Sequence, residues 1–182
     1  MKRFIIFKNN DNINDIIDVF KTLVGQNIEI ECSSNVIVRY NYENQNDIKE
    51  LLISFCNENM VDLICYVSSL QEAVINAEIN IGLNLIDKLP SGVYDLKNAL
   101  LNVKSCGNCK MILNAILSSS GVDEEFIKQF LSYDLNISRA SKNMYIHRNT
   151  LNYKIDKLYE LSGFDLRVFL DSYILYNLIQ NR

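Results

Sequence analysis

The chain has 182 residues, of which 48% are hydrophobic and 22% are charged. These proportions are close to the averages of folded globular proteins, so they exclude a disordered chain. No apolar run approaches the ~20 residues that a membrane-spanning helix needs. The apolar stretch Phe4–Phe7 is followed at once by Lys8, which excludes a secretory signal peptide. We therefore expect a cytoplasmic protein of one or two small domains, with no membrane partner.

The formal net charge is −4, and it is unevenly distributed along the chain. Residues 1–135 contain 11 Lys and Arg against 18 Asp and Glu, a net charge of −7, whereas residues 136–182 contain 7 against 4, a net charge of +3. Attraction to nucleic-acid phosphates needs only a local basic surface, so an acidic total does not exclude a DNA-binding protein. The split predicts an acidic body with a basic C-terminal end.

The first 90 residues alternate between strand and helix patterns. Alternating or richly apolar runs predict strands at 4–7, 28–32, 36–42 and 61–67, and helical spacing of apolar residues predicts helices at 13–24 and 48–55. The order βαββαβ is typical of the ferredoxin-like fold, a four-stranded antiparallel sheet with two helices on one face. We therefore assign residues 1–90 to a ferredoxin-like domain, which ends with a long amphipathic segment at 70–89 and Pro90.

Helices dominate the rest of the chain, so the predicted class is α+β. Residues 91–121 are expected to form a helical linker, with helices near 95–103 and 111–117 and the small polar stretch 118–121 at its end. Residues 122–182 are expected to form a helix-turn-helix domain, which opens on a helix with acidic residues in its first turn.

The helix-turn-helix is predicted from the spacing of residues between 137 and 161. Ser138 is expected to cap a short helix that runs through Met144, and residues 145–147 form the turn. The longer helix Arg148–Leu161 follows. Its apolar positions Leu151, Ile155 and Leu158 lie at i, i+4 and i+7 and predict a buried inner stripe. Ser141, with Ala140 beside it, is the small residue expected to let the two helices approach closely.

The outer face of the longer helix has side chains suited to DNA. Arg148 lies in the first turn, which is the part of a recognition helix that reaches base edges, and arginine can bind guanine O6 and N7 together. The residues expected to contact bases or phosphates are Ser138, Arg139, Lys142, His147, Arg148, Asn149, Thr150, Asn152, Tyr153, Lys154 and Lys157. The N-terminus of the helix also favours a phosphate. We expect duplex DNA as the partner and a homodimer as the binding form, because one helix spans too few base pairs for high specificity.

Two stretches carry a family resemblance. The sequence His147-Arg-Asn-Thr-Leu151 and the sequence Leu161-Ser-Gly-Phe-Asp-Leu166 resemble the C-terminal helix-turn-helix of PucR-type regulators, which include sugar-diacid regulators. The stretches 67–73 and 92–96 are similar to the end of the degenerate cyclase-like domain of those regulators. The resemblance implies a transcriptional regulator in which His147, Arg148, Thr150, Asn152 and Tyr153 are DNA-contact positions.

Three other functions compete with DNA binding. Cyclase-type catalysis needs acidic metal ligands in a glycine-rich hairpin, and the hairpin at 32–36 has neither glycine nor acid, so we expect no enzyme, no metal and no cofactor. The pair Cys106 and Cys109 leaves open a non-catalytic thiol or metal sensor, although a structural zinc site needs four ligands. A protein-interaction module is the third alternative. No residue pattern identifies a small-molecule effector.

Overall fold

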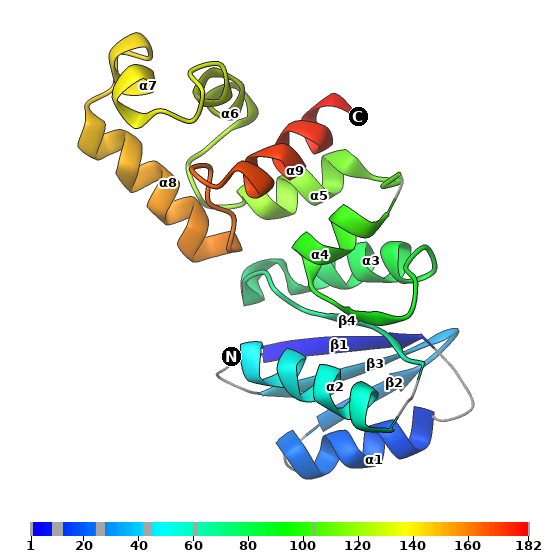
Figure 1. Cartoon of the computed structure of the whole chain (residues 1–182). Coiled ribbons are helices and arrows are strands. Elements are labelled where there is room, and N and C mark those ends of the chain that lie inside the picture. Colours follow the sequence, from blue (N-terminus) through cyan, green and yellow to red (C-terminus); the bar gives the residue numbers. More distant parts are fainter. Residues whose placement is uncertain are drawn as a thin grey trace. The chain divides into compact units, whose positions relative to one another are not determined.

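The computed structural model describes residues 2–8, 13–24, 28–41, 45–59, 62–103 and 105–181 (Figure 1). The chain divides into two compact units, Met1–Cys106 and Gly107–Arg182, and each is described by itself. The division falls inside the segment 91–121 that the sequence assigned to a linker.

The N-terminal unit is built on a five-stranded sheet with the strand order β2-β3-β1-β4-β5. The strands are β1 (Lys2–Lys8), β2 (Ile28–Cys32), β3 (Asn35–Asn41), β4 (Ile64–Val67) and β5 (Gly92–Tyr94). The first four strands pair antiparallel in the order expected of a ferredoxin-like core. The fifth strand was not expected; it adds to the edge by pairing parallel with β4, so the sheet is mixed. The α+β class is confirmed.

Helices cover both faces of this sheet. On one face, α1 (Ile13–Val24) and α2 (Gln45–Asn59) pack against Ile5 and Phe7 of β1. On the other face, α3 (Ile75–Ile86) packs against β1 and β4, as Figure 1 shows. A Cβ added to Gly82 of α3 would lie only 2.7 Å from Ile6 Cδ1, so this glycine lets the helix approach the sheet closely. Because both faces are covered, β1 is apolar without alternation.

Some predicted boundaries differ from the structure. The amphipathic segment at 70–89 contains a single 3₁₀ turn, η1 (Glu72–Val74), which is followed by α3. The fourth strand begins at Ile64 rather than at Val61, and Val61 lies outside the described residues, as does Tyr42 at the end of the predicted third strand. The last helix of the unit, α4 (Leu96–Asn102), is capped by Asp95, whose carboxylate accepts a hydrogen bond from Asn98 N at 2.8 Å.

The C-terminal unit is helical. Its helices are α5 (Cys109–Leu117), α6 (Glu124–Leu131), α7 (Ile137–Asn143), α8 (Arg148–Ser162) and α9 (Phe169–Gln180). The helix α9 packs against α5 and α6, with Leu175 fully buried, and α5 contributes the fully buried Leu113. In the part of the chain that the structure describes, no helix has the length and apolarity needed to span a bilayer.

A buried carboxylate ties α3 to the end of β4. Glu78 is 1% exposed, and its Oε1 accepts hydrogen bonds from Ser69 N at 2.6 Å and Leu70 N at 3.0 Å. The hydroxyls of Tyr66 and Ser69 donate to the same oxygen. Burial raises the pKa of Glu78, and these hydrogen bonds act in the opposite direction. The other oxygen, Oε2, has no hydrogen-bond partner among the residues that the structure describes.

This arrangement predicts different effects for two substitutions. Glu78→Ala leaves the two backbone N–H groups of Ser69 and Leu70 unpaired, which should lower the free energy of unfolding by about 2–4 kcal/mol. Glu78→Gln keeps the accepting Oε1 and removes the buried charge, so it should cost less than half as much. Urea unfolding of both variants at pH 7 measures the difference. An equal loss of unfolding free energy in the two variants would show that the charge of Glu78, rather than its hydrogen bonds, stabilises the segment after β4.

Candidate nucleic-acid interface

The helices α7 and α8 form a helix-turn-helix around one small residue. Ala140 of α7 is fully buried, and so are Leu151, Ile155 and Leu158 of α8. The inner stripe predicted for the second helix is therefore confirmed. Ala140 occupies the close contact, whereas Ser141, which the sequence placed there, is half-buried and donates its hydroxyl to Ser138 O at 3.2 Å.

Both helices of the motif have side-chain caps at their N-termini. The cap of α7 is Asn136, whose Oδ1 accepts a hydrogen bond from Arg139 N at 3.0 Å. The expectation that Ser138 caps this helix is wrong, because the cap lies two residues earlier and Ser138 is already inside the helix, which begins at Ile137. His147 caps α8, and its Nδ1 accepts a hydrogen bond from Asn149 N at 3.2 Å. His147 thus has a structural role besides the DNA contact predicted for it.

The turn between the helices contains an unusual residue. Ile146 N donates a hydrogen bond to Ser141 O at 3.1 Å. This 6→1 hydrogen bond is the Schellman motif, which ends many helices and needs a left-handed residue just before the donor. That residue is Tyr145, with φ of 53°. A left-handed conformation costs a non-glycine residue roughly 1–2 kcal/mol. The side chain of Tyr145 is also 97% exposed.

The predicted DNA-contact residues lie on the two helices of the motif and at the turn between them. Those with exposed side chains are Ser138, Arg139, Lys142, His147, Arg148, Asn149, Thr150 and Tyr153, while Asn152, Lys154 and Lys157 are half-buried. Arg148, Asn149 and Thr150 form the first turn of α8, where the helix N-terminus and the arginine both favour anions. The exposed first turn is the geometric feature that suits contact with a groove.

Ion pairs and short-range contacts engage some of the charged side chains. Arg139 Nη1 lies 2.5 Å from Asp134 Oδ2. Lys154 is directed toward α6: its Nζ donates to Gly121 O at 3.2 Å and lies 5.1 Å from the centre of the Phe126 ring. Lys154 was predicted to meet DNA, but these contacts use its ammonium group within the domain. The sequence could not reveal this, because Gly121 and Phe126 are about 30 residues away.

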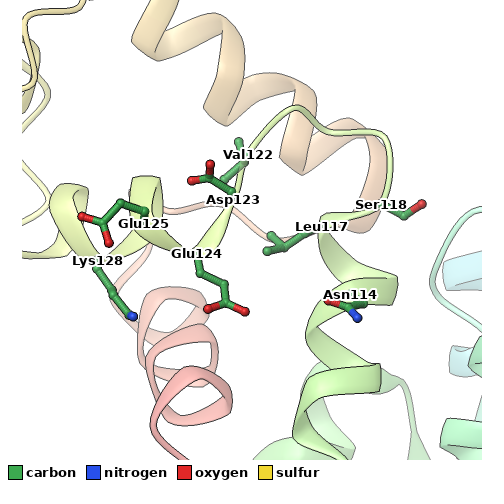
Figure 2. Close-up of a pocket in the computed structure, with 8 residues that line it drawn as sticks. All are labelled: Asn114, Leu117, Ser118, Val122, Asp123, Glu124, Glu125 and Lys128. Atoms are coloured by element: carbon green, nitrogen blue, oxygen red, sulfur yellow. The ribbon is translucent and has the colours of Figure 1, made fainter. Parts of the chain in front are cut away.

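An open pocket of about 560 Å³ lies at the corner between α5 and α6 (Figure 2). Its lining residues are Asn114, Leu117, Ser118, Val122, Asp123, Glu124, Glu125 and Lys128. Three carboxylates and one ammonium group make this pocket unfavourable for phosphates. Asp123 also caps α6, accepting a hydrogen bond from Phe126 N at 2.8 Å. The surface of α7 and α8 is therefore the better candidate for binding nucleic acid.

The cysteine pair of the sensor alternative lies at the division between the units. Cys109 is buried at the start of α5, Cys106 is half-buried, and both are disulfide-bonded. Among the described residues, no group of three or more His, Cys, Asp or Glu side chains is arranged to hold a metal ion. The metal-sensing alternative gains no support from this geometry.

The buried contact at Ala140, the left-handed turn and the exposed first turn of α8 define the C-terminal unit as a helix-turn-helix domain. Residues 125–177 match the model of a family described as the PucR C-terminal helix-turn-helix domain. The C-terminal unit is therefore a helix-turn-helix domain of the PucR type, and the resemblance drawn from the residues between 147 and 166 is confirmed.

Individual relatives share only part of this chain. The chain is 31% identical over 64 residues to the carbohydrate diacid regulator of Escherichia coli (strain K12), and the aligned segment covers 35% of this chain and 17% of that protein. It is 36% identical over 50 residues to the uncharacterized protein YxkF of Bacillus subtilis (strain 168), and that aligned segment covers 28% of this chain and 17% of that protein. The matched segment thus spans less than a fifth of either relative.

A comparison of whole structures finds a regulator of polyketide synthase expression from Bifidobacterium adolescentis. The two chains are 15% identical, with a TM-score of 0.47, and the superposition covers 99% of this chain and 78% of the other.

The two half-buried lysines of α8 make a matched pair for experiment. Lys154→Met should lower the free energy of unfolding by about 1 kcal/mol, because the hydrogen bond to Gly121 O and the contact with the Phe126 ring are lost. Its effect on DNA affinity should be small. Lys157→Met should leave stability within about 0.5 kcal/mol of wild type and weaken DNA binding.

Thermal melting and fluorescence anisotropy on the same duplex measure both quantities for each variant. If Lys154→Met weakens binding as much as Lys157→Met and melts like the wild type, the inward assignment of Lys154 is wrong.

Proposed function

We propose that this protein is a transcriptional regulator that binds double-stranded DNA sequence-specifically and reads the major groove through α8. The observation that carries the proposal is the exposed first turn of α8, with Arg148 and Asn149 on a helix-turn-helix domain of the PucR type. The exposed basic side chains belong to the segment with net positive charge, so the DNA would meet the basic end of an otherwise acidic chain.

The residues of the motif would divide into two roles. Arg148 is the candidate reader of a guanine, and Asn149 or Asn152 of an adenine, because their side chains pair bidentately with those base edges. Ser138, Arg139, Lys142, Thr150, Tyr153 and Lys157 are the candidates for phosphate contacts, which position the helix without reading sequence. His147 holds the first turn of α8 in place through its cap and can meet the backbone beside the groove.

This division predicts different signatures for Arg148 and Lys157. Arg148→Ala should weaken binding to a specific duplex by about 1–3 kcal/mol and relax the preference at one base pair, while the melting temperature stays close to wild type. Lys157→Met should weaken specific and scrambled duplexes alike and lower the slope of log affinity against log salt by about one.

The specific duplex is identified by sequencing the genomic fragments that the wild-type protein binds. Fluorescence anisotropy at several salt concentrations then measures the DNA affinity of both variants. Binding by Arg148→Ala that equals wild type on both duplexes, with normal melting, would overturn the recognition role of α8.

We also propose a homodimer, because two recognition helices on half-sites about one helical turn apart give the specificity that one helix lacks. One candidate surface is the β2 edge of the N-terminal sheet, because β2 is paired only with β3 among the described strands. Antiparallel pairing of two β2 strands about Ile30 would place Glu29 opposite Glu31 of the second copy. Like charges directly opposite each other destabilise a strand pair.

The outer face of α9 fits a second copy better. Phe169 is 73% exposed, and Val168, Leu170, Tyr173 and Tyr176 are each 47–48% exposed. The one charged residue of α9, Asp171, is buried, so the helix itself brings no charged side chain to a symmetric pairing. Since an aromatic side chain can bury about 150–250 Å², two such faces would bury roughly 1,000 Å² in total, which is near the lower limit for a specific interface.

This choice of surface is tested by charge insertion. The wild type should be a dimer at micromolar concentration by light scattering, Phe169→Glu should be a monomer, and Ile30→Glu on β2 should remain a dimer. Phe169→Glu should lose affinity for a duplex with two half-sites and keep its affinity for a single half-site. A wild type that is monomeric with and without DNA would contradict the dimer, and a dimeric Phe169→Glu would contradict the surface.

A further inference from the structure

We propose that Tyr145, in the turn of the motif, is a DNA-contact residue that binds the sugar-phosphate backbone beside the groove entered by α8. The inference rests on the proposed function, because it needs α8 to bind DNA. The sequence analysis assigned Tyr145 only to the turn, and two independent features of this residue in the structure point to a partner outside the chain.

The first feature is the backbone. Tyr145 has φ of 53°, in the left-handed region that favours glycine. The end of α8 solves the same problem with Gly163, whose φ is 75° and whose N donates to Tyr159 O at 2.7 Å. A glycine in place of Tyr145 would form the turn with less strain, so folding alone does not explain a tyrosine here.

The second feature is the side chain. At 97% exposure, the ring of Tyr145 has almost no packing within the chain that would compensate for the strained backbone. Tyr153 and Tyr159 of α8 are also exposed, at 65% and 53%, but they lie in ordinary helical backbone. Tyr145 alone of these three combines an exposed aromatic ring with a left-handed conformation, and such strain is most often kept where a residue has a function.

The position of Tyr145 indicates the chemistry of its partner. It precedes the cap His147 by two residues and Arg148 by three, so it lies at the end of α8 that would enter the groove. If α8 enters the groove, a side chain in the turn before the helix would lie at the groove edge, where DNA presents deoxyribose and phosphate. The phenol hydroxyl can donate to a phosphate oxygen, and the ring can pack on a sugar. Neither contact reads a base.

This role predicts that removing the side chain improves folding and impairs binding. Tyr145→Gly in the full chain should raise the melting temperature by about 2–4 °C, because the strain is relieved. It should lower affinity about tenfold for specific and scrambled duplexes alike, without changing the salt slope, because tyrosine carries no charge. Tyr145→Phe, which retains the ring and loses the hydroxyl, should lower affinity about threefold.

Two further variants separate the contact from the flexibility of glycine. Tyr145→Asn tolerates the left-handed conformation with less added freedom, and it should lose affinity as Tyr145→Gly does. Ser119→Gly is the matched control: Ser119 is exposed and has φ of 61° in the turn between α5 and α6. It should raise the melting temperature and leave DNA affinity unchanged.

The outcomes distinguish this inference from the proposed function. If Arg148→Ala weakens specific binding while Tyr145→Gly and Tyr145→Asn bind like the wild type, Tyr145 is not a contact and the proposed function stands. If the wild type binds no duplex, or Arg148→Ala changes nothing, the proposed function itself is wrong. A clear fall in the melting temperature of Tyr145→Gly would show that the tyrosine is structural, and would overturn the inference.

Discussion

The helix-turn-helix depends on the contact between Ala140 of α7 and the apolar stripe of α8. Ala140, Leu151, Ile155 and Leu158 are fully buried, so the rotation of α8 about its own axis is determined by which side must leave water. A larger residue at position 140 would separate the two helices and change the orientation of the outer face of α8. The orientation of Arg148 and Asn149 therefore follows from packing on the opposite side of their helix.

The ends of the two helices refine this arrangement. Asn136 and His147 begin α7 and α8 with side-chain hydrogen bonds, and the backbone hydrogen bond from Ile146 to Ser141 ends α7. Each bond satisfies a polar group that a helix end leaves without a partner. Together they restrict the direction in which α8 leaves the turn, which a groove-binding helix requires. His147 lies at a position where the family resemblance implies a DNA contact, and it has a structural role as the cap of α8 as well.

Local pattern was a good guide to the elements and a weaker guide to their neighbours. The order of the first four strands and the stripe of α8 follow from periodicities of two and 3.6 residues, which depend only on adjacent sequence. The strand β5 was missed because its three residues, Gly92–Tyr94, are too few to show alternation and pair only once β4 is in place. The cap of α7 was misplaced by two residues because Asn136 and Ser138 are both good cap residues.

The sequence by itself determined the α+β class, the helix-turn-helix and the set of polar residues on and around α8, because burial periodicity and charge are written in the order of residues. Tertiary structure alone decided which of those residues are available to a partner. Lys154 is engaged by Gly121 and Phe126, which only folding brings near it. Tyr145 is left exposed in a left-handed turn, because the closure between two packed helices, and not the tyrosine's own preference, sets its backbone conformation.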